Sequence, residues 1–136
     1  MAHHVEHLHA AEAVDDAIVR EAETERLVVV RFGHSVHADC VSVDAAMAAA
    51  AELVGPVAAL YAVDIEEVQD FNAMYELHDR PCTVMFFHGN RHVDVRGPHG
   101  SRYDIAWAAY NADEFVGLVW TVHERATAGR RLVDLD

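Results

Sequence analysis

Apolar residues recur along this chain with two periods, and the alternation between them predicts a mixed α/β fold. Helical spacing of the apolar positions runs through residues 10–24 and 38–54. Apolar runs rich in β-branched residues, typical of buried strands, occupy 27–32 and 57–63. A short helix is expected over 68–77, where Phe71, Met74 and Tyr75 are spaced at i, i+3 and i+4.

The C-terminal half predicts a β-hairpin followed by a helix. Residues 83–87 and 92–96 have strand character, and the Gly-Asn turn of 88–91 between them is a hairpin signal. Asn111 can cap the last helix, whose first turn is acidic, and Gly129 can end it.

The order of these elements predicts an α/β protein with a thioredoxin-like fold. We expect a central four-stranded mixed sheet with helices on both faces and an extra N-terminal helix, and residues 27–32 and 57–63 as neighbouring parallel strands. Residues 1–136 are expected to form a single domain, with 1–8 flexible and 130–136 a short C-terminal tail.

Composition narrows the possible functions. The N-terminus has no cationic start followed by an apolar segment, and no run approaches the ~20 apolar residues of a membrane span, so we expect an intracellular, soluble protein. A formal charge of −13 argues against unaided nucleic-acid binding. Residues 64–79 are acidic and contain no arginine. The stretch 80–102 is a candidate RNA- or partner-facing surface or an ordinary solvated hairpin; its arginines are Arg80, Arg91, Arg96 and Arg102.

The turn of residues 33–40 is where a thioredoxin carries its reactive dithiol, at the start of the helix that follows the first central strand. The position of the nucleophilic thiol is taken here by His37, while Cys40 keeps the position of the resolving thiol. Because imidazole cannot form a mixed disulfide, the residues favour an interaction module over a dithiol oxidoreductase.

The second cysteine, Cys82, follows Pro81 at the start of the hairpin. In a thioredoxin-like fold this loop packs against the dithiol turn, so Cys40 and Cys82 are expected to lie close enough to bridge. Two small buried thiols are the other interpretation, and it is the one we expect in a reducing compartment. The peptide bond between Arg80 and Pro81 is predicted to be cis, a conformation that X-Pro bonds adopt at small cost.

Histidine is frequent, with eleven in the chain. His34 and His37 share one turn and are candidate partner-facing residues, but neither they nor the N-terminal histidines have the spacing of an organised metal cage. We expect no metal, no cofactor and no catalytic residue.

Several stretches carry a more specific resemblance. They are His7-Leu8-His9, VVVRFGH (28–34), VDIEEVQDFNAMYELHD (63–79), PCTVMFF (81–87) and the T-V-x-x-x-A-x-x-G-R-x-L-V pattern (121–133). Together they resemble the Dim family of eukaryotic thioredoxin-like spliceosomal proteins, a component of the tri-snRNP, over about residues 7–133.

The resemblance implies a non-enzymatic, nuclear role in pre-mRNA splicing. Members of that family lack the thioredoxin dithiol and sit in the assembled, not yet activated spliceosome, where they contact the large scaffold protein near the 5′ splice site. Their paired cysteines match Cys40 and Cys82. This chain departs from the family in the turn 35–39, in an apparent insertion at Arg80, and in a tail that is nearly absent beyond residue 133.

Three hypotheses therefore remain. The first is a structural splicing factor, monomeric in isolation, that binds spliceosomal scaffold and tri-snRNP proteins and contacts small nuclear RNA only secondarily. The second is a thioredoxin-type oxidoreductase that uses Cys40 and Cys82. The third, weaker one is a free-standing RNA-binding protein that uses residues 80–102.

Overall fold

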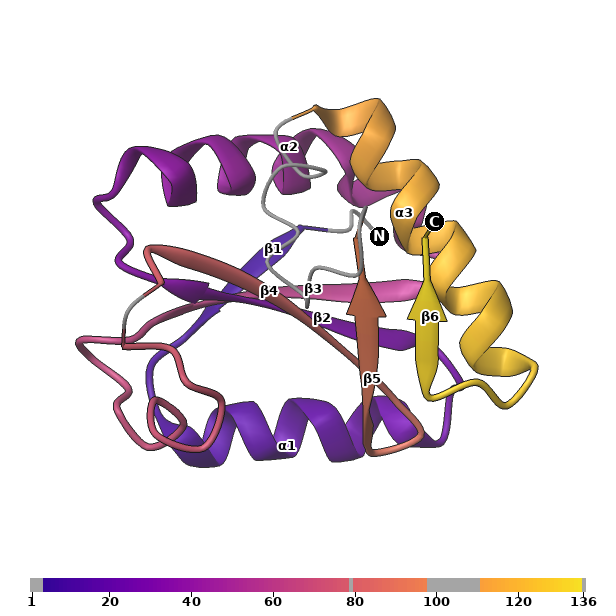
Figure 1. Cartoon of the computed structure of the whole chain (residues 1–136), viewed down its shortest axis with the longest axis horizontal. Coiled ribbons are helices and arrows are strands. Elements are labelled where there is room, and N and C mark those ends of the chain that lie inside the picture. Colours follow the sequence, from indigo (N-terminus) through magenta and orange to yellow (C-terminus); the bar gives the residue numbers. More distant parts are fainter. Residues whose placement is uncertain (1–3, 79, 98–110, 136) are drawn as a thin grey trace.

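A computed structural model describes residues 4–78, 80–97 and 111–135 of the chain. The strands among these residues form one six-stranded sheet, in the order β1-β3-β2-β4-β5-β6, and helices cover both of its faces (Figure 1). The elements in chain order are β1 (Val5–Leu8), α1 (Ala11–Ala22), β2 (Leu27–Gly33), α2 (Ala38–Val54), β3 (Ala58–Asp64), β4 (Cys82–His88), β5 (Arg91–Arg96), α3 (Ala112–Thr127) and β6 (Leu132–Asp134).

The centre of the sheet has the predicted topology. β2 and β3 are parallel neighbours, and β4 runs antiparallel to β2, so that Gly33 lies opposite Cys82. A parallel pair needs a crossover connection, and α2 supplies it. The α/β thioredoxin-like class is therefore confirmed.

Both ends of the chain add a strand that the sequence did not predict, so the sheet has six strands rather than four. Residues 5–8, expected to be flexible, form β1 and pair in parallel with β3, ahead of the N-terminal helix. Residues 132–134 of the expected tail form β6 and pair in parallel with β5. Each of these edge strands buries only one side chain, Leu8 or Val133, so neither carries a strong hydrophobic pattern.

Two apolar cores flank the sheet because successive strand side chains point to opposite faces. In Figure 1, α1 covers one face and α2 and α3 cover the other. On β2, Val29 packs with the α2 and α3 side, whereas Val28, Val30 and Phe32 pack with the α1 side. Burial of β2 on both faces explains its continuous apolar run.

The helix predicted over 68–77 is wrong, since the structure has a series of turns there. Phe71 and Tyr75 do meet, with ring centroids 6.0 Å apart, and both rings also lie near Phe32. At the end of the segment Glu76 has a positive φ of 57°, and the Leu77 N–H bonds to the Asn72 carbonyl rather than to the carbonyl four residues earlier, so the backbone departs from helical geometry there. The spacing of Phe71 and Tyr75 therefore reflects how their rings pack against Phe32 of the sheet, and it does not indicate a helix.

The last helix begins as predicted. The Asn111 side-chain oxygen accepts hydrogen bonds from the N–H groups of Asp113 and Glu114, at 2.8 and 3.4 Å. After the helix, Gly129 has a φ of 95°, a left-handed conformation that glycine adopts without steric cost.

Candidate functional site

In the turn that carries the dithiol in a thioredoxin, this chain has a histidine that caps the following helix. His37 is the N-cap of α2, and its Nδ1 accepts a hydrogen bond from the Asp39 N–H at 3.1 Å. It thereby satisfies one of the four N–H groups that a helix start leaves unpaired. The side chain at the nucleophile position thus has a structural partner and no thiol chemistry.

Cys40 and Cys82 lie side by side beneath this turn as free thiols, with only 0% and 1% of their surfaces exposed. The Cys40 thiol donates a hydrogen bond to the Pro81 carbonyl at 3.2 Å. A hydrogen bond to Cys40 together with burial raises the pKa of Cys82 far above the ordinary thiol value. The same hydrogen bond lowers the pKa of Cys40, and the nearby Arg31 acts in the same direction. Complete burial nevertheless keeps the Cys40 sulfur away from a substrate disulfide.

Gly33 and Pro81 bring the cysteines together. A Cβ atom at Gly33 would collide with the Cys40 sulfur and the Pro81 carbonyl oxygen, so only glycine fits between them. The Pro81 carbonyl also accepts a hydrogen bond from the His34 N–H at 3.1 Å.

The predicted cis bond before Pro81 is wrong, because the Arg80–Pro81 peptide is trans. The trans form is the favoured isomer of an X-Pro bond by about 0.5–1 kcal/mol. Since the Pro81 carbonyl already holds both the His34 backbone and the Cys40 thiol in this form, the docking of the loop does not require the cis isomer.

A small hollow opens beside His34, between the end of β2 and the turns after β3. Its volume is about 230 Å³, and its lining residues are His34, Ile65, Glu66, Gln69, Asn72 and His78. His34 Nδ1 and Glu66 Oε1 are 2.9 Å apart at the rim. Among these lining residues Asn72 is buried, and its Nδ2 donates to the Ile65 carbonyl at 2.9 Å.

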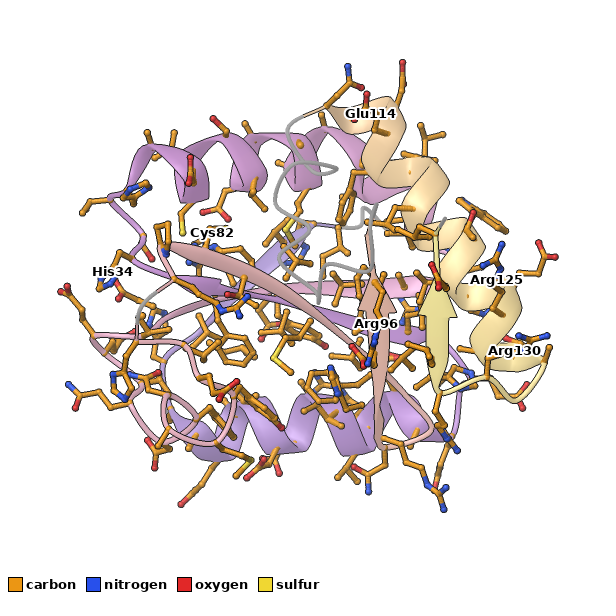
Figure 2. All side chains as sticks on the ribbon, viewed as in Figure 1. His34, Cys82, Arg96, Glu114, Arg125 and Arg130 are labelled. Atoms are coloured by element: carbon orange, nitrogen blue, oxygen red, sulfur yellow. The ribbon has the colours of Figure 1, made fainter. Side chains whose placement is uncertain are left out.

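The described arginines of the 80–102 stretch, those up to residue 97, do not form one patch. Arg80 precedes β4 and Arg91 follows it, and a strand of seven residues separates them by about 20 Å. Arg91 is exposed at the hairpin, whereas Arg96 pairs with Asp94 at 3.4 Å. Arg102 lies outside the described residues. Figure 2 shows His34 and Cys82 on one side of the view, with Arg96 on the other.

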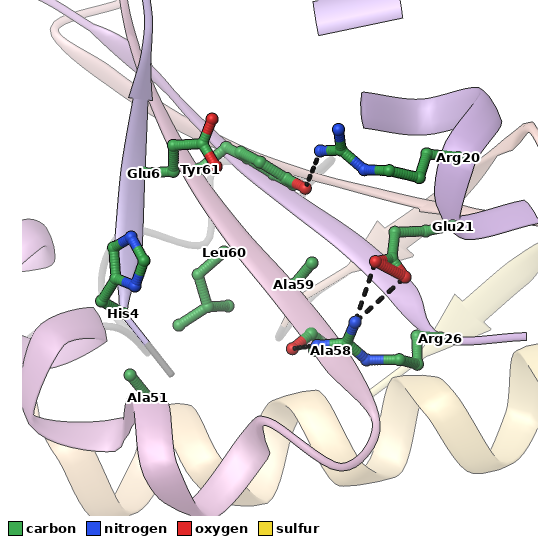
Figure 3. A pocket seen from close by; sticks show the side chains of 10 residues that line it. All are labelled: His4, Glu6, Arg20, Glu21, Arg26, Ala51, Ala58, Ala59, Leu60 and Tyr61. Carbon is green, nitrogen blue, oxygen red and sulfur yellow. Dashed lines mark hydrogen bonds and ion pairs between the residues drawn. The ribbon is translucent and has the colours of Figure 1, made fainter. Parts of the chain in front are cut away.

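A second hollow, of about 210 Å³, lies beside β1 and β3, and Figure 3 shows the side chains that line it. Its arginines are engaged. Arg26 pairs with Glu21 at 2.8 Å and donates to the Gly55 and Ala58 carbonyls, and Arg20 donates to the Tyr61 hydroxyl at 3.0 Å. These contacts tie α1 to β3.

The described residues hold neither a cluster of metal ligands nor a helix that could span a membrane. Nowhere in 4–78, 80–97 and 111–135 do three His, Cys, Asp or Glu side chains gather as metal ligands would. Within the same ranges, no helix combines the length and apolar character of a membrane span.

Sequence reasoning missed Asn72, and it treated Glu66 only as part of an acidic run. Their meeting with His34 depends on the loop after β3 folding back over the end of β2, where the Ile65 N–H bonds to the Gly33 carbonyl. The sequence did offer one signal, because Asn72 lies between the large apolar residues Phe71 and Leu77. A turn that buries these two side chains also buries the polar side chain between them.

Comparison with known proteins agrees with this geometry. The family model described as "Mitosis protein DIM1" matches residues 4–135. The mitosis protein dim1 of Schizosaccharomyces pombe is 40% identical over 133 residues, covering 98% of this chain and 92% of that protein. The spliceosomal protein DIB1 of Eremothecium gossypii is 41% identical over 127 residues, covering 93% and 87%.

Among solved structures, the thioredoxin of Fasciola hepatica superposes with a TM-score of 0.64 at 19% identity, covering 85% of this chain and 97% of that one. This likeness supports the fold alone. The family match and the identities run over nearly the whole length, and this chain therefore belongs to the DIM1 family.

Proposed function

We propose that this protein is a non-enzymatic pre-mRNA splicing factor of the nucleus, a structural component of the tri-snRNP and of the spliceosome before activation. In this role it acts by protein contacts near the 5′ splice site. The observation that carries the proposal is His37, which caps a helix where a thioredoxin has its nucleophile, in a chain 41% identical to a protein named for the spliceosome.

The chemistry of the site supports a role without catalysis. A thioredoxin reaction needs an accessible thiolate at the helix start and a second thiol to resolve the mixed disulfide. His37 offers no sulfur, and Cys40 is fully buried. The thioredoxin-type oxidoreductase hypothesis therefore lacks its attacking group.

Electrostatics supports protein partners over RNA. A formal charge of −13 repels phosphate, and screening over about 8 Å at physiological salt weakens this repulsion without reversing its sign. Arg80 and Arg91 lie beyond opposite ends of β4, so these two arginines do not form one continuous basic surface. The purified protein should show no tight binding to small nuclear RNA at ~150 mM salt, and nanomolar affinity there would contradict this part of the proposal.

The proposal is tested by affinity capture from native nuclear extract, probed for the small nuclear RNAs and for the large scaffold protein. Co-capture of the tri-snRNP RNAs is expected, and their absence from a folded bait would contradict the proposal. The matched control is the bait with Asp16→Ala, an exposed change on α1.

An insulin-reduction assay separates the redox hypothesis. The protein should show no turnover. The variant His37→Cys places a thiol three residues before Cys40 at a helix start and should gain measurable activity. It is the positive control, because it shows that the assay detects a dithiol on this fold. Turnover by the unmodified protein at a rate like that of a thioredoxin would overturn the proposal.

A further inference from the structure

The C-terminal end of α3 and the segment that follows it carry a cluster of arginines. Arg125 lies in the last turn of α3, and Arg130 and Arg131 precede β6. The Arg130 N–H bonds to the Arg125 carbonyl at 3.0 Å, and both residues line one hollow of about 330 Å³. Figure 2 shows these two side chains on the same side of the molecule. Three exposed cations are thus gathered within seven residues of a chain with a formal charge of −13.

The β4–β5 hairpin adds a fourth arginine at this end of the sheet. β5 begins at Arg91 and runs parallel to β6, and the Asp94 N–H bonds to the Arg131 carbonyl at 2.8 Å. By this register Arg91 precedes the position opposite Arg131 by two residues, about 7 Å along the strand. Within the described residues, no ion pair neutralises Arg91, Arg130 or Arg131.

An exposed tryptophan lies beside the cluster. Trp120 on α3 has 44% of its surface exposed, and its Nε1 donates to the Leu53 carbonyl at 3.2 Å, a contact that orients the ring. A hollow of about 410 Å³ adjoins the ring, and its other lining residues are Thr121, His123, Glu124 and Thr127. Glu124 also lines the hollow of Arg125 and Arg130, so the aromatic hollow and the arginine hollow are neighbours.

Cations beside an exposed aromatic ring are the combination with which proteins hold single-stranded nucleic acid. From it we infer that this surface contacts single-stranded RNA, with Trp120 stacked on a base and the arginines on phosphates. The inference deepens the proposed function, on which it rests, by giving the secondary RNA contact a surface. Guanidinium groups match phosphate oxygens in a bidentate way. An acidic protein segment is the poorer ligand, because it uses the arginines but leaves the Trp120 ring without a stacking partner.

The contact is weak in isolation because the whole chain is anionic. Screening over about 8 Å at physiological salt confines the attraction of the arginines to phosphates that are already close. The dissociation constant is expected to be on the order of 10⁻⁴ M at ~150 mM salt, the weak end of non-specific binding. Such a contact forms once protein partners have placed the domain, and it agrees with the absence of tight RNA binding by the purified protein.

The inference is tested by NMR titration of the full-length protein at ~150 mM salt. The probes are octauridylate, an octamer of abasic nucleotides with the same phosphates, and octaglutamate. Octauridylate should shift the Trp120 indole N–H and the backbone resonances of residues 125–131 in a saturable way. It should bind at least about fivefold more tightly than the abasic octamer, because base stacking on an aromatic ring contributes that much. Octaglutamate should bind at least about fivefold more weakly and leave the indole resonance unshifted.

Two arginine variants separate this surface from the general charge of the chain. Arg130→Gln removes a cation of the cluster, and Arg80→Gln removes the same charge beyond the far end of β4. Arg130→Gln should weaken octauridylate binding about fivefold, and Arg80→Gln less than twofold. Binding to single strands has a log–log salt slope of about −0.7 per neutralised phosphate, so Arg130→Gln should also reduce the slope by about 0.7.

Two glutamate variants test the sign of the effect. Glu124 is the one carboxylate among the described residues that line the two hollows, and it repels phosphate there. Glu114 lies ten residues earlier, about 15 Å along the helix, and Figure 2 shows it at the other end of α3. Both side chains are exposed, so both variants should fold. Glu124→Gln should strengthen octauridylate binding about threefold, and Glu114→Gln should leave it unchanged within about 1.5-fold.

Equal binding of the abasic octamer or of octaglutamate, equal weakening by Arg130→Gln and Arg80→Gln, or an unshifted Trp120 indole would overturn the inference. Because the titration uses no particle, its failure leaves the capture of the tri-snRNP untouched. Conversely, failure of that capture would leave the binding of octauridylate as measured.

Discussion

Breaking the buried ion pair of Arg31 and Asp44 should be one of the most destabilising single changes in this protein. Arg31 lies in the central strand β2 with 0% of its side chain exposed, and Asp44 on α2 is 27% exposed. The pair is bidentate, with two N–O distances of 2.7 Å. The Arg31 Nη1 atom donates further to the Val63 carbonyl at 3.2 Å.

Replacing Asp44 by alanine leaves a guanidinium buried without its counter-charge. Removal of one partner of a buried pair costs about 3–5 kcal/mol. We expect about 3 kcal/mol, the lower end, because the partial exposure of Asp44 lets water reach the vacated side of Arg31 and the Val63 carbonyl remains. For a chain of this length such a loss lowers the Tm by about 10 °C.

Urea unfolding followed by far-ultraviolet circular dichroism measures this change. Asp16→Ala, an exposed change on α1, is the control and should stay within about 0.5 kcal/mol of the parent. The double variant Arg31→Met, Asp44→Leu should be clearly more stable than Asp44→Ala, because it leaves no charge buried. A cost below about 1 kcal/mol for Asp44→Ala, or a double variant no more stable than the single one, would refute the reasoning.

Three further predictions concern stability. Gly33→Ala should cost about 1–3 kcal/mol in urea unfolding, because a methyl group there collides with the cysteine sulfur and a carbonyl; an unchanged midpoint would contradict the close packing. Asn111→Ala should cost about 1 kcal/mol through the lost helix cap and Asn111→Asp almost nothing, so equal losses in thermal unfolding would contradict a capping role. The raised pKa of Cys82 means that the folded state holds a proton that the unfolded chain releases, so stability is fully present below about pH 8.5 and falls at higher pH by up to about 1.4 kcal/mol per pH unit. Because the two thiols share a hydrogen bond, the test replaces both: Cys40→Ser with Cys82→Ala should remove that part of the slope in unfolding curves between pH 8 and 10, and an unchanged slope would contradict the assignment.

The sequence was sufficient to predict the centre of the fold. Strand β2 is buried on both faces, and this burial explains its continuous hydrophobic run. Helix α2, which connects β2 to β3, buries one face, and this burial explains its helical spacing of apolar residues. The edges could not be predicted in the same way. β1 and β6 are held mainly by backbone pairing with β3 and β5, and backbone hydrogen bonds leave little trace in the pattern of side chains.

The candidate site was predictable only in part. The loss of the nucleophile could be recognised from His37 alone, because chemistry depends there on residue type. The hollow with Asn72 and Glu66 depends on how an irregular loop folds over β2, which periodicity does not specify. Arg31 was a missed signal of another kind: an arginine inside the run LVVVRF has to find a carboxylate, and Asp44 on the facing helix provides it.

Splicing in a nuclear extract depleted of the endogenous DIM1-family protein tests the central claim most directly. The purified protein and its cysteine-free variant, Cys40→Ser with Cys82→Ala, are added back in equal amounts after circular dichroism shows that both are folded. Both should restore splicing of a reporter pre-mRNA to the same extent, because protein contacts and not thiol chemistry perform the function. Failure of the folded cysteine-free variant beside a working parent, or failure of both, would contradict the account.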